Sequence, residues 1–358
     1  MHAPWPDTRL LHLLGIALPI LQAPMAGAGL SALAAAVAKA GGLGALPCAM
    51  LTPEAAAAEI RLFRAQAAQP LNLNFFCHPP PAVDAAHDAQ WRQLLRPYYE
   101  ALGLDPETAL PAAARKPFDA AMCALVEAER PAVVSFHFGL PAPALLERVK
   151  ATGAKVLSSA TTVREAVWLE ARGCDAIIAQ GVEAGGHRGM FLSDDISTQL
   201  GTMALVPQIV DAVQVPVIAA GGIGDARGIA AAFALGAAGV QLGTVYLLSP
   251  EATISPVHRA ALQHLGDDDT ALTRLFSGRP ARGIVNRLMR DLGPMNPAAP
   301  AFPLAGAALA PLRAQTEPSG ISDFMPLWAG QARRYAQALP AAVLTQRLAE
   351  ETLQRLRR

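Results

Sequence analysis

The stretch DAIIAQGVEAGGHRG, residues 175–189, carries the residue types best suited to chemistry in this chain. An apolar run ends at Gln180, and glycines and one histidine follow it. Glycine has no Cβ atom, so Gly185 and Gly186 let the backbone adopt positive φ angles and approach a ligand closely. His187 comes next, and imidazole is the side chain whose charge changes most readily near neutral pH. We therefore expect a strand that ends in a reactive loop; the simpler alternative is a tight Gly-Gly turn beside a solvated histidine.

Short apolar runs alternate with Ala-rich helical segments over most of the first 248 residues, a pattern typical of a parallel sheet. Eight strands are expected, at Pro19–Met25, Leu43–Pro47, Leu71–Phe76, Ala132–Phe138, Lys155–Ser159, Ala176–Ala179, Pro216–Ala220 and Gly239–Leu247. Eight strand–helix units that close on themselves form an α/β fold, the (β/α)8 TIM barrel, whose active sites lie at the carboxyl ends of the strands. A doubly wound open sheet is the alternative, because strand counts taken from sequence are error-prone.

Two segments break this alternation. Residues 78–116 contain three consecutive prolines and a partly amphipathic helical stretch, which indicates an insertion over the carboxyl ends of the strands. Residues 249–321 contain three consecutive aspartates and a Pro-, Ala- and Gly-rich tract, which indicates a smaller subdomain on the substrate side. We expect the barrel to occupy residues 1–248, insertion included, and residues 322–358 to form C-terminal helices that pack back on it.

On such a barrel, residues that end separate strands converge on one pocket. They are Pro24 and Met25 after the first strand, Asn74 on the third, His137 on the fourth and Gln180 on the sixth. We expect His137 to pack or to support its neighbours rather than to act directly, and Glu183 to be solvated. No set of His, Asp and Glu residues has the spacing of a metal site.

Glycine-rich turns follow the last two expected strands, as AAGGIGD at 219–225 and QLGT at 241–244. Barrels often bind phosphate at this place through backbone N–H groups and a helix N-terminus. Gly222 would remove side-chain bulk there, and Thr244 would offer a hydroxyl. The sequence has no G-x-G-x-x-G after a strand and no P-loop motif, so a dinucleotide-binding fold is not indicated.

Composition excludes several classes of function. Hydrophobic residues make up 52% of the chain and charged residues 16%, as expected for a folded protein with much buried strand and helix. The formal net charge is zero and there is no Lys/Arg run, so neither nucleic acid nor a membrane is an expected partner. The charge-free segment 10–38 superficially resembles a signal peptide, but prolines and glycines interrupt it before it reaches a membrane-spanning length. The widely spaced cysteines, which favour free thiols and a reducing cytoplasm, are Cys48, Cys77, Cys123 and Cys174.

Taken together, these motifs resemble those of nitronate monooxygenases, formerly called 2-nitropropane dioxygenases, of the larger bacterial and fungal class. The matching motifs, in order, are QAPMAG at 22–27, AGGLG at 40–44, NLNFF at 72–76, SFHFGLP at 135–141, QGVEAGGHRG at 180–189, AGGIGD at 220–225, QLGT at 241–244 and LWAGQ at 327–331. The ordered set covers nearly the whole chain and is far more specific than any single motif.

The resemblance implies an FMN-dependent enzyme that oxidises alkyl nitronates, with nitroalkanes as a further substrate class, by O2 to carbonyl compounds and nitrite, without NAD(P)H. It implies that His187 is the catalytic base or the group that orients the substrate. The expected cofactor-binding residues are Met25, Asn74, Gln180, Gly185, Gly222, Gln241, Leu242, Gly243 and Thr244. The expected partners are a small-molecule nitronate and O2, without a metal. The expected protein is a cytoplasmic monomer or homodimer that detoxifies nitroalkanes.

Three other readings remain open from the sequence. A flavin-dependent enoyl-acyl-carrier-protein reductase or NADH:quinone reductase is the nearest, because relatives with the same barrel share the QAPM, GGH and GGIG elements. NAD(P)H oxidation separates these reductases from nitronate oxidation. A flavin-binding module without turnover is a second alternative, and a barrel enzyme that acts on a phosphorylated metabolite without flavin is a third.

Overall fold

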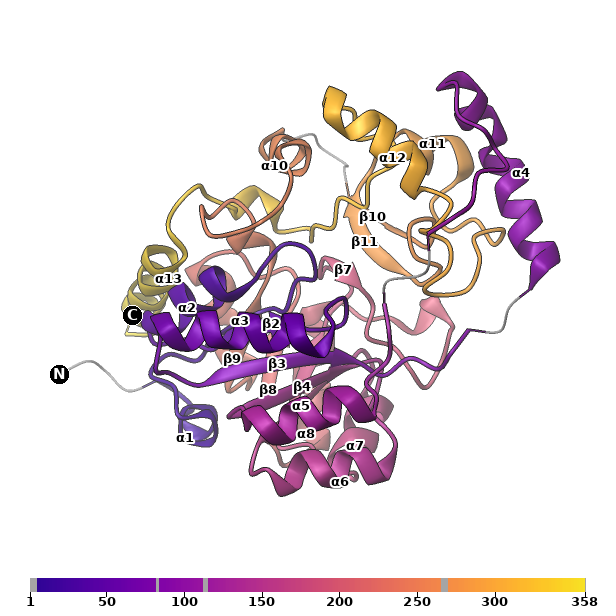
Figure 1. Ribbon diagram of the computed structural model, residues 1–358. Coiled ribbons are helices and arrows are strands. Elements are labelled where there is room, and N and C mark those ends of the chain that lie inside the picture. The colour runs from indigo at the N-terminus through magenta and orange to yellow at the C-terminus, as the bar shows by residue number, and fades with distance from the viewer. Residues whose placement is uncertain (1–4, 82–83, 112–114, 265–269, 358) are drawn as a thin grey trace.

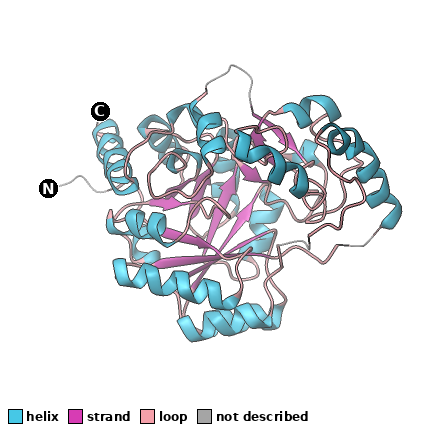
Figure 2. Ribbon diagram, turned by 45° about the horizontal axis from the view of Figure 1, so that its top comes forward, coloured by secondary structure: helices cyan, strands magenta, loops and turns pink. Residues whose placement is uncertain are grey.

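The computed structural model describes residues 5–81, 84–111, 115–264 and 270–357. Eight parallel strands form one sheet in the order β1-β9-β8-β6-β5-β4-β3-β2, and helices surround it (Figure 1, Figure 2). These strands are β1 (Ile20–Gln22), β2 (Gly44–Pro47), β3 (Leu71–Phe76), β4 (Val133–His137), β5 (Lys155–Ala160), β6 (Ala176–Gln180), β8 (Val217–Ala220) and β9 (Gly239–Leu242). The eight strands lie where the sequence predicts them.

The first and second strands close the sheet on itself. A parallel bridge joins Leu21 of β1 to Leu43, just before β2. Gln22 N donates to Leu43 O at 2.9 Å, and Leu43 N donates to Ile20 O at 3.0 Å. The predicted TIM barrel is thus confirmed, and the alternative of a doubly wound open sheet is wrong. The first and last strands are the most shortened relative to the prediction, because β1 ends at Gln22 and the chain after Leu242 turns into a 3₁₀ helix, η2 (Thr244–Tyr246).

The helices that alternate with the strands are α2 (Ser31–Lys39), α3 (Pro53–Gln66), α5 (Ala120–Glu129), α6 (Pro143–Ala151), α7 (Val163–Glu170), α8 (Thr202–Ala212) and α9 (Ala226–Ala234). Side-chain caps fix several of their starts. Thr52, Thr162 and Asp225 accept backbone N–H bonds in the first turns of α3, α7 and α9. Such caps satisfy N–H groups that have no partner within the helix.

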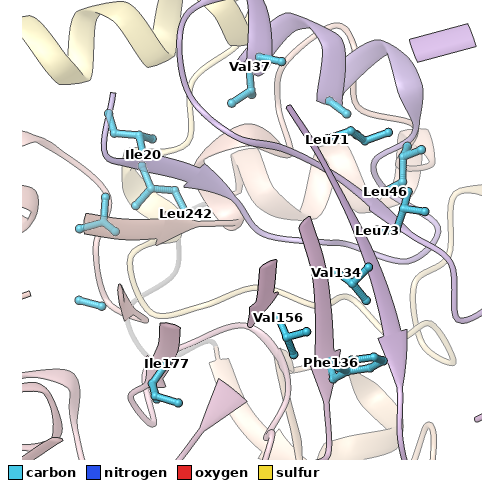
Figure 3. Packing of buried hydrophobic residues seen from close by; sticks show 14 of the residues in the cluster. Ile20, Val37, Leu46, Leu71, Leu73, Val134, Phe136, Val156, Ile177 and Leu242 are labelled. Atoms are coloured by element: carbon cyan, nitrogen blue, oxygen red, sulfur yellow. The ribbon is translucent and has the colours of Figure 1, made fainter. Parts of the chain in front are cut away.

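The core has an outer and an inner layer because successive strand residues point to opposite faces. On β6, Ile177 packs outward against the helices, whereas Ile178 points into the barrel. Figure 3 shows part of the outer layer, with Ile20, Phe136 and Leu242 from separate strands. The short helix α1 (Arg9–Leu14) places Leu10 and Leu14 in the inner cluster. No helix in the described part of the chain is long and apolar enough to cross a membrane.

A second, three-stranded antiparallel sheet lies above the barrel, in the order β10-β11-β7. Its strands are β7 (Gly186–His187), β10 (Thr270–Thr273) and β11 (Ala281–Ile284). His187 pairs with Ala281 of β11. The expectation of a reactive loop is therefore corrected: His187 lies on a short strand that ties the barrel to the segment after residue 249.

The insertion packs on the segment after residue 249, at one edge of the molecule in Figure 1. Its helix α4 (Ala85–Ala101) buries Trp91 and Tyr99 in a shared apolar cluster with Leu309. The Trp91 indole donates to Ala305 O at 3.1 Å, and the Tyr99 hydroxyl donates to Ala308 O at 2.6 Å. The remaining helices are η1 (Ile196–Thr198), α10 (Pro256–Gln263), α11 (Arg287–Leu292), α12 (Ala310–Thr316), η3 (Glu317–Ser319), η4 (Arg333–Tyr335) and α13 (Ala341–Leu356). The domain boundaries near residues 248 and 321 remain a prediction.

Candidate active site

A cavity of about 410 Å³ lies at the carboxyl ends of the barrel strands, a size typical of small-molecule sites. Nine of the ten residues singled out from the sequence line it: Met25, Asn74, Gln180, Gly185, His187, Gly222, Gln241, Gly243 and Thr244. Leu242 does not; its side chain is buried in the outer core. The barrel thus brings together residues that lie far apart in the sequence.

One end of the cavity presents backbone donors. Among the described residues, no acceptor lies against the backbone N–H groups of Gly222, Gly243 or Thr244. The Thr244 hydroxyl oxygen accepts from Gly330 N at 2.9 Å, so its own proton is free to point into the cavity. Gln241 Oε1 is buried and has no hydrogen-bond partner within the part of the chain that the structure describes. Such a donor-rich end suits a phosphate and a neighbouring polyol.

The N-terminus of α9 is already capped and is not available to a phosphate, whereas the N-terminus of the 3₁₀ helix η2 has no side-chain cap. Asp225 caps α9, and its Oδ1 accepts from Arg227 N at 2.9 Å and from Gly228 N at 3.2 Å. The glycine turn itself is needed for shape, because Gly222 has a φ of +69° and an added Cβ would lie 3.3 Å from the Glu183 Cβ. A phosphate at this end would therefore depend on the N–H groups of Gly222, Gly243 and Thr244, which have no acceptor among the described residues.

Gly186 has the expected positive φ, +73°, whereas Gly185 does not. A contact between Gly185 and a cofactor remains a prediction, and its missing side chain is needed for packing. An added Cβ would lie 2.5 Å from Gly330 N, so the missing side chain allows residues 329–330 to pass close to the barrel. Glu183 is also not simply solvated. Its carboxylate accepts from Thr202 N and from the Thr202 hydroxyl, each at 2.9 Å, while Gln331 N donates to its backbone carbonyl at 3.0 Å. Both residues hold neighbouring segments around the cavity.

The backbone of His187 is held by two side chains from the barrel. Its carbonyl oxygen accepts from Gln180 Nε2 at 3.0 Å and from His137 Nε2 at 3.2 Å. A carbonyl can only accept, so Nε2 of His137 carries the proton and Nδ1 accepts from Ser159 Oγ, 3.0 Å away. Gln180 Oε1 also accepts from Gly189 N at 2.8 Å. The expectation that His137 supports its neighbours fits this geometry.

Aromatic rings surround the His187 imidazole. Its ring centroid lies 5.3 Å from Phe302, 5.4 Å from Trp328 and 6.2 Å from Phe76. Its Nε2 lies 2.9 Å from Ser277 Oγ, on the turn before β11. Rings of this kind keep water from the imidazole and fix its plane.

The electrostatic surroundings of His187 are positive. Burial holds the pKa of His187 well below its ordinary value, and the nearby charges of Arg115 and Arg279 lower that pKa further. The imidazole is therefore neutral at pH 7. A site with a neutral imidazole and fixed positive charges favours an anion over a neutral or cationic ligand.

A buried arginine, Arg188, holds the segment around His187 in place. Arg188 is fully buried and donates to Gln180 O at 2.6 Å, Gly181 O at 2.7 Å and Gln199 Oε1 at 2.9 Å. Burial lowers its pKa to about 10, so it remains charged at pH 7. Arg188 directly follows β7, so its guanidinium fork ties the carboxyl end of β6 to the strand that carries His187.

Several cavity residues were not expected from the sequence. Arg115, from the insertion, and Arg313, from α12, both line the cavity, as do His258 and Trp328. Only Trp328 had a signal, within the LWAGQ motif. The arginines lie in Ala- and Pro-rich stretches without a recognisable pattern, and they come together only because the insertion folds against the segment after residue 249.

Comparison with known proteins identifies the family. The sequence profile described as "Nitronate monooxygenase" matches residues 7–351. The chain belongs to the nitronate monooxygenase family. It is 44% identical over 347 residues to a nitronate monooxygenase of Paraburkholderia phytofirmans, covering 96% of this chain and 95% of that one. It is 42% identical over 345 residues to a nitronate monooxygenase of Pseudomonas aeruginosa, covering 96% and 98%.

Two solved structures share the fold over their full lengths. The nitroalkane oxidase of Streptomyces ansochromogenes superposes with a TM-score of 0.88 at 39% identity, covering 97% of this chain and 98% of that one. FabK from Thermotoga maritima superposes with a TM-score of 0.74 at 28% identity, covering 98% and 97%. The expected nitronate monooxygenase family is therefore confirmed, and the chain is an enzyme of the oxidoreductase class.

Proposed function

We propose that this enzyme oxidises alkyl nitronates with O2 to carbonyl compounds and nitrite, using bound FMN and no NAD(P)H. The observation that carries the proposal is the neutral His187 in a positive surrounding, with Arg115 and Arg279 close enough to lower its pKa. A nitronate is an anion and is favoured there. Membership of the nitronate monooxygenase family supports the same substrate class.

The residues present fit FMN. The free N–H groups of Gly222, Gly243 and Thr244 would hold the phosphate, and the unpartnered Gln241 Oε1 would accept from a flavin N–H or a ribityl hydroxyl. Asn74 Nδ2 donates to Ser135 Oγ at 2.9 Å. The Oδ1 atom of Asn74 would then accept from the flavin ring. Bound FMN would take electrons from the substrate and pass them to O2.

The protein's own contribution is to bind, orient and dehydrate the substrate. Phe76 and Trp328 exclude water from the place beside His187 where an anion would lie. A buried anion is stabilised when fixed donors and positive charges replace its water shell. His187 would hold the nitronate through one N–H bond.

Neutral nitroalkanes should be poorer substrates. They must first lose a proton from the carbon that bears the nitro group, and a base acts best when its pKa lies near the working pH. The pKa of His187 is well below this range. We therefore propose nitronates as the main substrates and nitroalkanes as slower ones. We also propose a cytoplasmic monomer or homodimer.

Anaerobic spectra of the purified protein test this function. A yellow protein with releasable FMN should lose its absorbance near 450 nm on addition of propyl-2-nitronate, and turnover in air should consume O2 and release nitrite. NADH and NADPH should not bleach the flavin. Rapid bleaching by NADH without a response to nitronate would instead support the alternative of a flavin-dependent reductase.

A further inference from the structure

The His187 ring has only one nitrogen available to the cavity. Its Nε2 lies 2.9 Å from the hydroxyl of Ser277, a fully buried residue. No partner for Nδ1 lies among the described residues. The ring packs against Phe302 and Trp328, with centroids 5.3 Å and 5.4 Å away, and these contacts oppose a rotation that would exchange its two nitrogens. Any hydrogen bond or proton exchange with a substrate must therefore use Nδ1.

The Ser277 hydroxyl has one proton and two possible acceptors. Its Oγ lies 3.3 Å from the Arg279 carbonyl oxygen, which can only accept. When Ser277 donates to that carbonyl, its oxygen accepts the Nε2 proton of His187, and Nδ1 carries a lone pair. When the hydroxyl rotates and donates to Nε2, Nδ1 carries the proton. The hydroxyl therefore decides between two neutral forms of the same ring.

We propose that Ser277 is a positioning residue that holds Nε2 of His187, presents Nδ1 to the substrate and, by donating or accepting, sets whether Nδ1 acts as a base or as a hydrogen-bond donor. The proposal rests on the proposed function and deepens it. At rest, donation to Arg279 O keeps that carbonyl paired, so His187 is protonated at Nε2. Leaving the carbonyl without its partner would cost free energy.

The two forms serve the two substrate classes. With a neutral nitroalkane, Nδ1 takes the proton from the α-carbon, and the electron pair of the broken C–H bond forms the C=N bond of the nitronate. The Nε2 proton of the resulting imidazolium stays on Ser277. With a nitronate, which has already lost that proton, the second form binds the anion. Nδ1 takes a proton from solvent in the cavity and Nε2 releases its proton to solvent, so that the Ser277 hydroxyl can donate to Nε2 while Nδ1–H donates to a nitronate oxygen. The exchange adds one proton at Nδ1 and removes one at Nε2, so the proton count and the charge of the His187–Ser277 pair do not change.

Nitrogen NMR of the imidazole tests the resting form directly. Protein labelled with ¹⁵N-histidine, in its flavin-bound form, gives separate signals for protonated and unprotonated ring nitrogens, and His187→Asn identifies the signals of His187. Wild type should be protonated at Nε2. Ser277→Ala should shift the proton to Nδ1, because an N–H at Nε2 would have no acceptor in a buried position. Ser277→Thr, which keeps the hydroxyl, should restore the wild-type form.

Steady-state kinetics test the consequence. Ser277→Ala should lower kcat/KM for a nitroalkane about tenfold, as loss of one hydrogen bond typically does, and leave kcat/KM for the matching nitronate within about twofold. The ratio of the two should return toward wild type in Ser277→Thr. Ser158→Ala is the matched control, because Ser158 is equally buried and donates to the carbonyls of Phe136 and Gly139 away from His187. It should change neither the ratio nor the tautomer.

Two results would overturn the proposal: wild type protonated at Nδ1 at rest, or Ser277→Ala with unchanged tautomer and unchanged ratio while flavin content is normal. Its failure is separable from failure of the proposed function. If wild type oxidised no nitronate but the NMR results were as expected, the function would be wrong and the role of Ser277 in fixing the ring would stand.

Discussion

Replacing Gly222 by Asp is the sharpest test of where a cofactor phosphate would bind. The variant places a carboxylate at the turn whose N–H groups have no acceptor among the described residues. Asn is the matched control, since it has the same shape without the charge. Gly222 has a φ of +69°, and Asp and Asn tolerate this left-handed region better than other residues, at a cost of about 1 kcal/mol. The backbone strain should therefore be equal in both variants.

The difference in FMN affinity between the two variants isolates the effect of the added charge. Two unit charges about 4 Å apart interact by about 4 kcal/mol at an effective dielectric constant of about 20. Even half of this repulsion would weaken FMN binding by about 30-fold, because each 1.4 kcal/mol changes Kd about tenfold. An added Cβ would also lie 3.6 Å from the Glu183 carboxyl carbon. Repulsion from Glu183 acts on the free and bound protein alike, so it lowers stability without entering the difference in Kd.

The assay is a fluorescence titration of the flavin-free proteins with FMN, with riboflavin as a ligand that lacks the phosphate. Gly222→Asp should bind FMN at least about 30-fold more weakly than Gly222→Asn, and the two should bind riboflavin equally. Equal Kd values for FMN in the two variants would refute the phosphate assignment. Thermal unfolding of each flavin-free variant shows whether the fold is retained.

Three further outcomes are expected. His187→Asn should lower turnover of neutral nitroalkanes by about 10²–10⁴-fold and that of nitronates much less, measured as O2 consumption at equal flavin content; equal losses would mean that His187 only positions the substrate. Arg188→Met should lower the free energy of unfolding by about 3 kcal/mol or more, since three acceptors lose a charged donor. Arg172→Met is the control: Arg172 is exposed and its guanidinium lies 3.8 Å from the centroid of the Trp168 ring, a contact worth less than about 1 kcal/mol. Burial lowers the pKa of His137 to about 3 and that of His78 and of His258 to about 4. Below about pH 6.5 the unfolded chain binds these protons and the folded chain does not. The free energy of unfolding should therefore fall from that pH toward pH 4 by about 1.4 kcal/mol per pH unit for each histidine. An unchanged midpoint of urea unfolding between pH 7 and pH 5 would contradict this.

The barrel could be predicted from the sequence because its signal is local. Each short apolar run, such as Lys155–Ser159, lies between turn residues, and a helical segment usually follows it. The order of these units determines the fold. Residues at strand ends, such as Asn74 and Gln180, could be placed in the pocket for the same reason. Parallel strands bring their carboxyl ends to one side.

The rest could not be predicted because it depends on contacts between distant segments. Nothing near His187 in sequence indicates that it pairs with Ala281 or that Ser277 contacts its ring. Arg115 and Arg313 reach the cavity from two irregular segments whose mutual packing has no periodic signal. Leu242 lies within the QLGT motif, but the alternation of strand faces turns its side chain to the outer core.

The packing of α13 has a consequence for the order in which the chain can fold. This helix packs against α2 and α9, on the side of the barrel where β1 pairs with β9, and Tyr246 bonds to Thr345 within it. During synthesis, the apolar faces of α2 and α9 leave the ribosome long before residues 341–356 can cover them. Contacts between segments so far apart form late and carry a large loop-closure cost. The nascent barrel therefore passes through a stage in which the apolar faces of α2 and α9 are exposed. At that stage chaperones could bind these faces, and other chains could associate with them.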